Sequence, residues 1–121
     1  MATGPIQQSI FGLGRIPYSF RCYRVNNPFS LFPVLHNKSG VYIFADLSRN
    51  NTMGTTIPTV LYVGKTNSFN ERVTERHEKW DNAKDLITHI CLLDETDENR
   101  RVAIERDIYD KHNPPLNDKR P

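Results

Sequence analysis

The sequence contains little cysteine and no long hydrophobic run, and each shortage narrows what the chain can be. Its two cysteines, Cys22 and Cys91, lie far apart and in no spacing typical of a metal site. We expect both to be reduced thiols in a cytosolic protein. No apolar stretch approaches the roughly 18–20 residues that cross a bilayer, and the first residues lack the pattern of a secretion signal. The sequence therefore predicts a cytoplasmic protein without membrane contact.

Charge of either sign is not in large excess. The net charge is +2 and the isoelectric point is near 8.6, so an anionic partner is permitted but not required. Apolar residues make up 37% and charged residues 25% of the 121 residues, as in ordinary soluble proteins. This length suits one domain with a substantial core that needs no disulfide or metal to hold it together.

Residues 1–38 show the weakest pattern of regular structure. Prolines divide this segment and exclude a long helix or a central strand. We therefore expect an irregular arm packed on a domain formed by residues 39–121. Only residues 18–25 alternate well enough for a short strand, and the arm's aromatic residues are expected to cover part of the core: Phe11, Phe20, Phe29 and Phe32. An arm that contacts DNA is an open alternative, with cations at Arg15, Arg21 and Arg24.

The rest of the chain alternates between strand and helix patterns. The predicted order is strand, strand, helix, strand and helix, over about residues 40–47, 59–63, 69–81, 86–93 and 97–111. The polar stretch 48–58 indicates a long hairpin connection. Ser68, with Glu71 three residues later, and Thr96 are the expected helix N-caps. This order predicts an α+β fold, with helices flanking a small three-stranded antiparallel sheet.

Five polar residues of these elements have the chemistry that phosphodiester hydrolysis requires: Tyr42, Tyr62, Lys65, Arg72 and Glu105. Hydrolysis needs an activated water and positive charge on the phosphate, and a carboxylate can hold a Mg²⁺ ion that supplies part of that charge. Arginine suits phosphate because its planar fork can hold two oxygens. Each residue also has an ordinary interpretation: the tyrosines can be core residues, the cations surface charges, and Glu105 the ion-pair partner of Arg101.

The motifs in this order resemble the GIY-YIG nuclease family. Gly40-Val41-Tyr42 is similar to the first signature triplet, and Tyr62-Val63-Gly64 to the second. Arg72 and Glu105 stand where the family has its helix arginine and its metal-binding glutamate. The tail Asn113-Pro114-Pro115-Leu116-Asn117 resembles the segment that closes the family domain. The resemblance covers about residues 38–118.

The resemblance implies a DNA endonuclease that uses one divalent metal, Mg²⁺ or Mn²⁺, bound by Glu105. Tyr42 would be the leading candidate for the general base, and Tyr62 would position the water or the phosphate. An ordinary phenol has a pKa of about 10, so nearby positive charge from Lys65 and the metal would have to lower it. Arg72 would stabilise the phosphate charge. The further substrate-binding positions that the resemblance implies are Gly64, Arg76 and Asn117, of which Asn117 would orient its neighbours.

The chain departs from the family pattern on the predicted helix. Many members carry a histidine or tyrosine one turn after the arginine, where this chain has Arg76, and His77 comes one residue later. Two alternatives stay open: Arg76 binds phosphate, or a small shift brings His77 into the catalytic site.

We expect no additional target-choosing domain within these 121 residues, so target choice would come from the arm, the 48–58 loop, a homodimer or a partner protein. The resemblance points to a bacterial or phage-type intracellular protein. Two other functions remain open, namely a non-catalytic nucleic-acid-binding module on the same scaffold and a purely structural protein.

Overall fold

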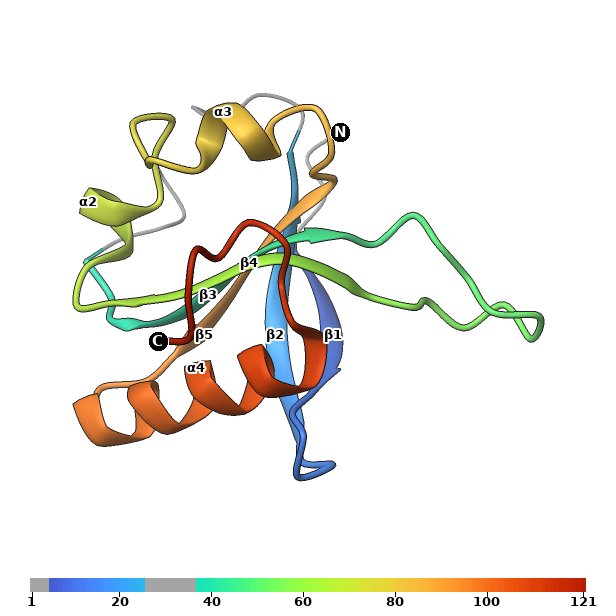
Figure 1. Ribbon diagram of the computed structural model, residues 1–121, viewed down its shortest axis with the longest axis horizontal. Helices are drawn as coiled ribbons and strands as arrows, with labels where there is room; N and C mark the ends of the chain where they lie inside the picture. Colours follow the sequence, from blue (N-terminus) through green and yellow to red (C-terminus); the bar gives the residue numbers. More distant parts are fainter. Residues whose placement is uncertain (1–4, 26–36) are drawn as a thin grey trace.

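The computed structural model describes residues 5–25 and 37–121, which form one antiparallel sheet with helices on both of its faces (Figure 1). The sheet has five strands in the order β1-β2-β5-β3-β4. These strands are β1 (Ile6–Phe11), β2 (Pro17–Arg24), β5 (His89–Asp94), β3 (Gly40–Asp46) and β4 (Thr59–Thr66). The α+β prediction is confirmed, but the prediction of three strands is wrong.

The two additional strands come from the segment expected to be an irregular arm; β2 matches the short strand expected over residues 18–25, whereas β1 was not expected. β1 and β2 form a hairpin in which Phe11 lies opposite Pro17, and β2 then pairs with β5. Pro17 is tolerated because it is the first residue of its strand, where a missing backbone N–H does little harm. Phe20 is completely buried, as expected, whereas Phe11 is largely exposed. The expected core positions of Phe29 and Phe32 lie outside the described residues.

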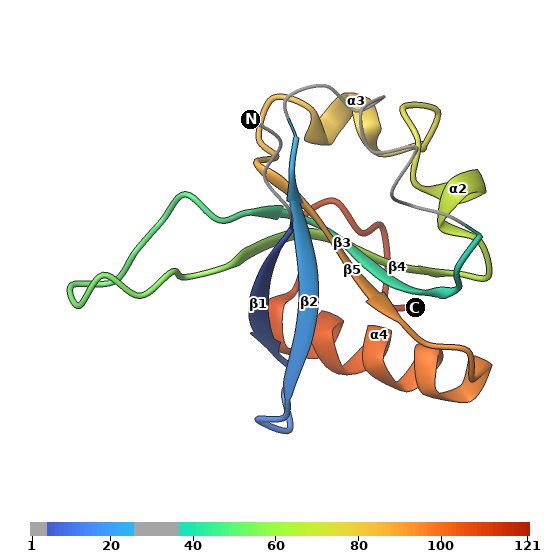
Figure 2. The ribbon, with the colours of Figure 1, turned by 180° about the vertical axis from the view of Figure 1, so that it is seen from behind.

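Strand alternation divides the apolar side chains between two cores. Along β3, Val41 and Ile43 face α4 (Glu98–His112), whereas Tyr42 and Phe44 face the short helices α2 (Phe69–Arg72) and α3 (Trp80–Ala83). Figure 2 shows the same division from behind, with α4 on one side of the sheet and α2 and α3 on the other. Any residue that connects these two faces must therefore lie near a sheet edge.

The predicted helix over residues 69–81 is interrupted, because α2 ends at Arg72 and α3 begins only at Trp80. Between the two helices, side chains accept hydrogen bonds from backbone N–H groups. The Thr74 hydroxyl accepts from the Arg76 N–H at 3.1 Å, and His77 Nδ1 accepts from the Lys79 N–H at 3.0 Å. Such local bonds compete with the helical pattern. Ser68 occupies the expected N-cap position, but its side chain makes no capping hydrogen bond.

The last helix lies close to its predicted range, with a different cap. Asp97, not Thr96, accepts hydrogen bonds from the N–H groups of Asn99 at 2.9 Å and Arg100 at 3.4 Å. The helix ends at Asn113, which has the left-handed φ of 47° and precedes a proline. No helix in the ranges 5–25 and 37–121 is long and apolar enough to cross a membrane. Cys22 and Cys91 are buried free thiols on neighbouring strands.

Asp107 of α4 joins the β1–β2 hairpin to the rest of the fold. Its carboxylate accepts hydrogen bonds from the Tyr18 hydroxyl at 2.7 Å and from the Gly14 N–H at 3.2 Å, and its backbone carbonyl accepts from the Leu13 N–H. Burial and this carboxylate together raise the pKa of Tyr18 to about 12. The first strands of the chain are thus fixed to its last helix.

We predict that Asp107→Ala lowers the free energy of unfolding by about 1–3 kcal/mol, because the hairpin loses its charged acceptor. Urea unfolding measures this loss. Asp85→Ala is the matched control, since Asp85 is exposed and has no ion pair among the described residues, and it should change stability by less than about 0.5 kcal/mol. Equal effects of the two substitutions would contradict a specific role for Asp107.

Candidate active site

The signature glycine Gly64 makes room for the phenol of Tyr42. These two residues lie directly opposite each other on β4 and β3. A Cβ atom on Gly64 would come within 2.5 Å of both Cζ and the hydroxyl oxygen of Tyr42. Gly40 is equally confined, because a Cβ there would meet the Leu93 carbonyl of β5 and the ring of Phe69. Both glycines are therefore required by packing, which explains their place in the sequence without any contact with substrate.

Tyr42 and His77 form a buried hydrogen-bonded pair, with 2.7 Å between Oη and Nε2. His77 Nδ1 already accepts the Lys79 N–H, so the single proton of the neutral ring must lie on Nε2, which donates to Tyr42. Burial lowers the pKa of His77 to about 4, with the Arg72 charge as a second cause. The ring is therefore neutral near pH 7. Of the two open alternatives on this segment, His77 is the residue that the structure brings to the tyrosines.

Tyr62 lies between this buried pair and solvent. Its ring centroid is 6.0 Å from that of Tyr42 and 4.9 Å from that of His77. Tyr42 is completely buried, whereas Tyr62 is partly exposed. Burial raises the pKa of both phenols, and the Arg72 charge opposes the rise in both. In this arrangement a water molecule would meet Tyr62 before Tyr42.

Arg72 is paired with a carboxylate that the sequence did not single out. Its guanidinium donates two hydrogen bonds of 2.6 Å to the two oxygens of Glu78. This contact lowers the pKa of Glu78 to about 2. Because both side chains are partly exposed, a phosphate could replace Glu78 on the same fork. The pair forms only because the chain turns sharply after α2, which is why sequence spacing did not reveal it.

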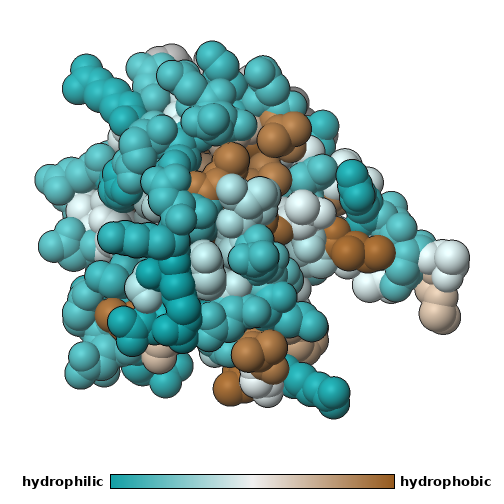
Figure 3. All heavy atoms as spheres, in the orientation of Figure 1, coloured by the Kyte–Doolittle hydropathy of each residue, from teal (hydrophilic) through white to brown (hydrophobic). Residues whose placement is uncertain are grey.

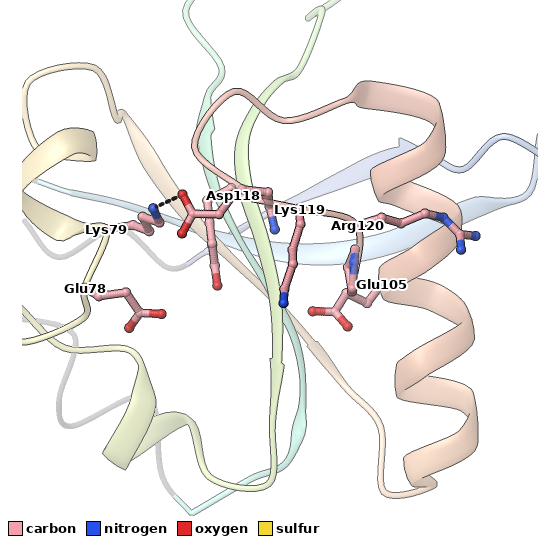
Figure 4. Close-up of a pocket in the computed structure, with 9 residues that line it drawn as sticks. Glu78, Lys79, Glu105, Asp118, Lys119 and Arg120 are labelled. Atoms are coloured by element: carbon pink, nitrogen blue, oxygen red, sulfur yellow. Dashed lines mark hydrogen bonds and ion pairs between the residues drawn. The ribbon is translucent and has the colours of Figure 1, made fainter.

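Glu105 enters the site from α4 and lines a cavity of about 310 Å³ (Figure 4). The cavity is lined by Tyr62, Glu78, Lys79, Glu105, Asn117, Asp118, Lys119, Arg120 and Pro121. Glu105 is only 7% exposed, and no hydrogen bond or ion pair joins its carboxylate to another described residue. Arg101, the ordinary partner considered above, pairs with Glu98 instead. Burial raises the pKa of Glu105 from 4.5 to about 6, and the charge of Lys65 opposes this rise.

Lys65 and Arg76 do not join the tyrosines. The Lys65 ammonium lies 2.8 Å from Glu98 at the start of α4, on the other face of the sheet from Tyr42. Lys65 therefore acts on the pKa of Glu105, and the cation that lowers the pKa of the phenols is Arg72. This corrects the expectation that Lys65 would do so. The Arg76 side chain is exposed and makes no hydrogen bond or ion pair with other described residues.

Asn117 fastens the tail to the edge strand β4. Its amide accepts from the Val63 N–H and donates to the Val63 carbonyl, both at 3.0 Å, and the Leu116 N–H donates to the Leu61 carbonyl. These bonds satisfy backbone groups that an edge strand would otherwise expose. The tail is thereby held across the cavity, where Lys119 points toward Glu105 (Figure 4).

Several residues of the cavity were missed at the level of sequence. Glu78, Lys79 and Lys119 lie in strongly polar stretches and look like surface charges. Lys79 bridges to Asp118 at 2.6 Å, a contact that depends on the tail crossing the cavity. The described residues contain no cluster of three or more potential metal-ligating side chains. Of the cavity's carboxylates, Glu78 and Asp118 are paired with Arg72 and Lys79, and Glu105 has no ion-pair partner among the described residues.

Comparison of the fold with solved structures finds several structures of one domain. The chain is similar to crystal structures of the GIY-YIG N-terminal endonuclease domain of UvrC from Thermotoga maritima, determined as point mutants bound to the catalytic divalent cation. For two of these structures the TM-score is 0.58 and the identity 17% and 16%, over 78% of this chain and 98% of that domain. No family model and no curated protein sequence matches the chain. The described residues thus have the fold of a GIY-YIG domain, and the resemblance in the sequence is confirmed at that level.

We predict that Gly64→Ala lowers the free energy of unfolding by about 1–3 kcal/mol, because the new methyl group would displace the Tyr42 phenol from His77. Gly14→Ala is the matched control, since a Cβ there comes no closer than 4.0 Å to its nearest neighbour. Thermal or urea unfolding compares the two. A Gly64 variant as stable as the wild type would show that the close Tyr42–Gly64 contact is not a constraint.

The raised pKa of Glu105 gives a pH signature that needs no activity assay. The folded state holds this proton more tightly than the unfolded chain, so its contribution to stability is complete below about pH 4.5 and is lost as the pH rises through about 6. Glu105→Gln removes this dependence. Relative to the wild type, we expect the variant to become more stable by up to about 2 kcal/mol between pH 4 and pH 7.5, measured by urea unfolding across that range. A difference that does not change with pH would contradict the raised pKa.

Proposed function

We propose that this chain is a metal-dependent endonuclease that hydrolyses DNA phosphodiester bonds. The observation that supports this most is the shared cavity: Glu105, a buried carboxylate without an ion-pair partner among the described residues, lines it together with Tyr62. A protein cavity that places an uncompensated carboxylate beside a phenol favours binding of a cation at that carboxylate. The similar solved structures are endonuclease domains bound to a catalytic divalent cation.

The residues present fit one divalent cation held by Glu105. Mg²⁺ commonly binds proteins through one or two carboxylates and keeps several waters, so a site with one carboxylate needs no cluster of ligands. The raised pKa of Glu105 reflects the cost of leaving its charge uncompensated, and a cation would remove that cost. When bound there, the cation would supply positive charge to the phosphate and favour ionisation of a nearby water. Mn²⁺ could replace Mg²⁺ in the same role.

Tyr62 is the phenol that we propose to contact the attacking water or the phosphate, since it lines the cavity. Tyr42, the expected general base, is completely buried behind it, so we assign it a supporting role. His77 donates to the Tyr42 oxygen. This donor would stabilise negative charge on that oxygen and would fix the ring against which Tyr62 packs. His77 is therefore proposed to position the phenols rather than to remove a proton from Tyr42.

Arg72 is proposed to bind the phosphate after exchanging Glu78 for it. The charge of the guanidinium opposes the rise in the pKa of both phenols, so a phosphate bound to it would be near the tyrosines. In the free protein Glu78 holds both of its outer N–H groups. Substrate binding would therefore separate this pair and leave the Glu78 carboxylate to solvent. Gly64 and Asn117 support the site through packing and the backbone of β4, while a phosphate contact by the exposed Arg76 remains a separate proposal.

The Arg72–Glu78 pair also favours a second candidate function. A guanidinium that remains neutralised by Glu78 would not stabilise a transition state, and the scaffold would then serve as a non-catalytic nucleic-acid-binding module. Such a module would bind DNA in a salt-dependent manner without breaking it. Turnover is therefore the measurement that separates the two functions.

We predict that the wild-type protein nicks supercoiled plasmid DNA in Mg²⁺ or Mn²⁺, and that Glu105→Gln and Arg72→Ala each lower the rate by about 100-fold or more. Glu75→Gln and Lys111→Ala are matched controls, because both residues are exposed and outside the cavity. A loss with Arg76→Ala comparable to that of Arg72→Ala would give Arg76 the phosphate contact. Undiminished nicking by Glu105→Gln would contradict the metal-dependent mechanism, and salt-sensitive binding without any nicking would favour the second function.

A further inference from the structure

The connection between β3 and β4 forms a two-stranded finger, residues 47–58, that projects from the body of the protein (Figures 1 and 2). The two sides of the finger are paired: the Ile57 N–H donates to the Arg49 carbonyl and the Asn51 N–H to the Thr55 carbonyl, both at 2.8 Å. Asn50 and Thr56 form a bridge between them. The expected hairpin connection is therefore an ordered extension of the strands that carry Tyr42 and Tyr62.

The tip of the finger is shaped by its own side chains. The Asn51 side-chain oxygen accepts from the N–H groups of Met53 at 2.9 Å and Thr55 at 3.0 Å, and the Asn51 carbonyl accepts from Gly54. Gly54 has a φ of 81°, a left-handed conformation that disfavours other residues. All hydrogen bonds that the structure gives to residues 48–57 stay within residues 46–57. The hydrogen bonds of the finger are thus all made within it and with Asp46 at its base.

The surface of the finger suits a nucleic acid. Residues 48–55 are all exposed, and between Leu47 and Thr59 the sequence has an arginine and no acidic residue. The other polar side chains are amides and hydroxyls, which are common partners of base edges and phosphates. Met53 is 88% exposed and stands at the turn. In Figure 3 the finger is mostly hydrophilic, with apolar atoms near its base and tip.

The length of the finger matches the geometry of duplex DNA. Met53 is separated from Tyr62 by about nine residues of extended chain, or roughly 30 Å at 3.3 Å per residue. One turn of B-DNA is about 34 Å. A two-stranded ribbon also fits the major groove, which is about 12 Å wide, but not the minor groove of about 6 Å.

We propose that this finger docks in the major groove of duplex DNA about one helical turn from the bond that the site hydrolyses. The proposal rests on the proposed function, and it assigns part of target choice to this loop. Arg49 and Asn50 supply polar contacts along the groove, and Met53 supplies an apolar contact at its far end. Both kinds of contact are presented by a hydrogen-bonded ribbon that continues strands β3 and β4.

Two finger variants test this proposal. The first replaces residues 50–56 by Asn-Gly, a two-residue turn that suits a hairpin, closing the ladder at the Arg49–Ile57 pair. The second is Arg49→Ala with Met53→Ala, which leaves the backbone of the finger intact. Lys111→Ala is the matched control, because it removes an exposed positive charge at the far end of α4. Far-UV circular dichroism and thermal unfolding establish that each variant is folded.

Binding is measured by fluorescence anisotropy with a random-sequence duplex of 30 base pairs and a hairpin-closed duplex of 6 base pairs, in buffer without divalent metal. We expect both finger variants to bind the longer duplex about tenfold more weakly than the wild type. The shorter duplex should bind with unchanged affinity, because six base pairs span only about 20 Å and cannot reach both the cavity and the finger. Methylation of guanine N7 should weaken binding of the longer duplex by the wild type but not by the shortened variant. In plasmid nicking, KM should rise while kcat stays within about twofold.

The outcomes separate this proposal from the one on which it rests. Finger variants that bind the longer duplex as tightly as the wild type would overturn it, as would an equal loss on both duplexes or insensitivity to N7 methylation. Finger-dependent binding without nicking by the wild type would support the docking role and overturn only the nuclease function. Nicking by the wild type that does not depend on the finger would support the nuclease function and overturn the docking role.

Discussion

The register between β3 and β4 is the constraint on which the rest of the site depends. It sets Gly64 opposite Tyr42, so the phenol lies over the backbone of β4 where no side chain competes with it. A slip of one residue would send Tyr42 to the opposite face of the sheet and break its bond to His77. That bond in turn anchors the segment between α2 and α3, which brings Glu78 back to Arg72. One strand register thus positions a phenol, an imidazole and a guanidinium.

The position of β4 at the edge of the sheet lets residues from both faces reach one cavity. Tyr62 approaches from the face covered by α2 and α3, and Glu105 approaches from α4 on the other face. The Asn117 amide and the tail close the edge without filling the cavity. Burial raises the pKa of the phenols and of Glu105. The site is therefore arranged so that added positive charge, from a divalent cation or from Arg72 released by Glu78, is favoured.

The central strands and the last helix could be predicted from sequence because their patterns are local. The strand-like patterns around Tyr42 and Tyr62, and the polar stretch between them, were sufficient to predict two strands joined by a hairpin connection. Only the short strand over residues 18–25 was expected in the first segment, and β1 was missed because the prolines indicated an irregular arm, although Pro17 occupies a strand start where proline is harmless. The helix break between α2 and α3 depends on side-chain bonds of Thr74 and His77 to nearby backbone. Those contacts form only in the folded chain.

The residue types of the candidate site could be proposed from sequence, but the ion-pair and hydrogen-bond partners of those residues could not. The family resemblance pointed to Tyr62, Arg72 and Glu105, of which Tyr62 and Glu105 line one cavity while Arg72 pairs with Glu78 beside it. Their catalytic roles stay predictions. Glu78 could not be found because its partner Arg72 is brought to it by the turn, and Lys119 because the tail crosses the cavity only in three dimensions. The burial of Tyr42 behind Tyr62 also depends on packing from the opposite helices, which no spacing along one strand reveals.

The most direct test of this account is a crystal structure with Mn²⁺, with the ion located by its anomalous scattering. The account predicts one ion in the cavity, bound by a Glu105 carboxylate oxygen on the side that faces Tyr62. An ion bound only elsewhere, or a cavity without an ion at saturating Mn²⁺, would contradict it.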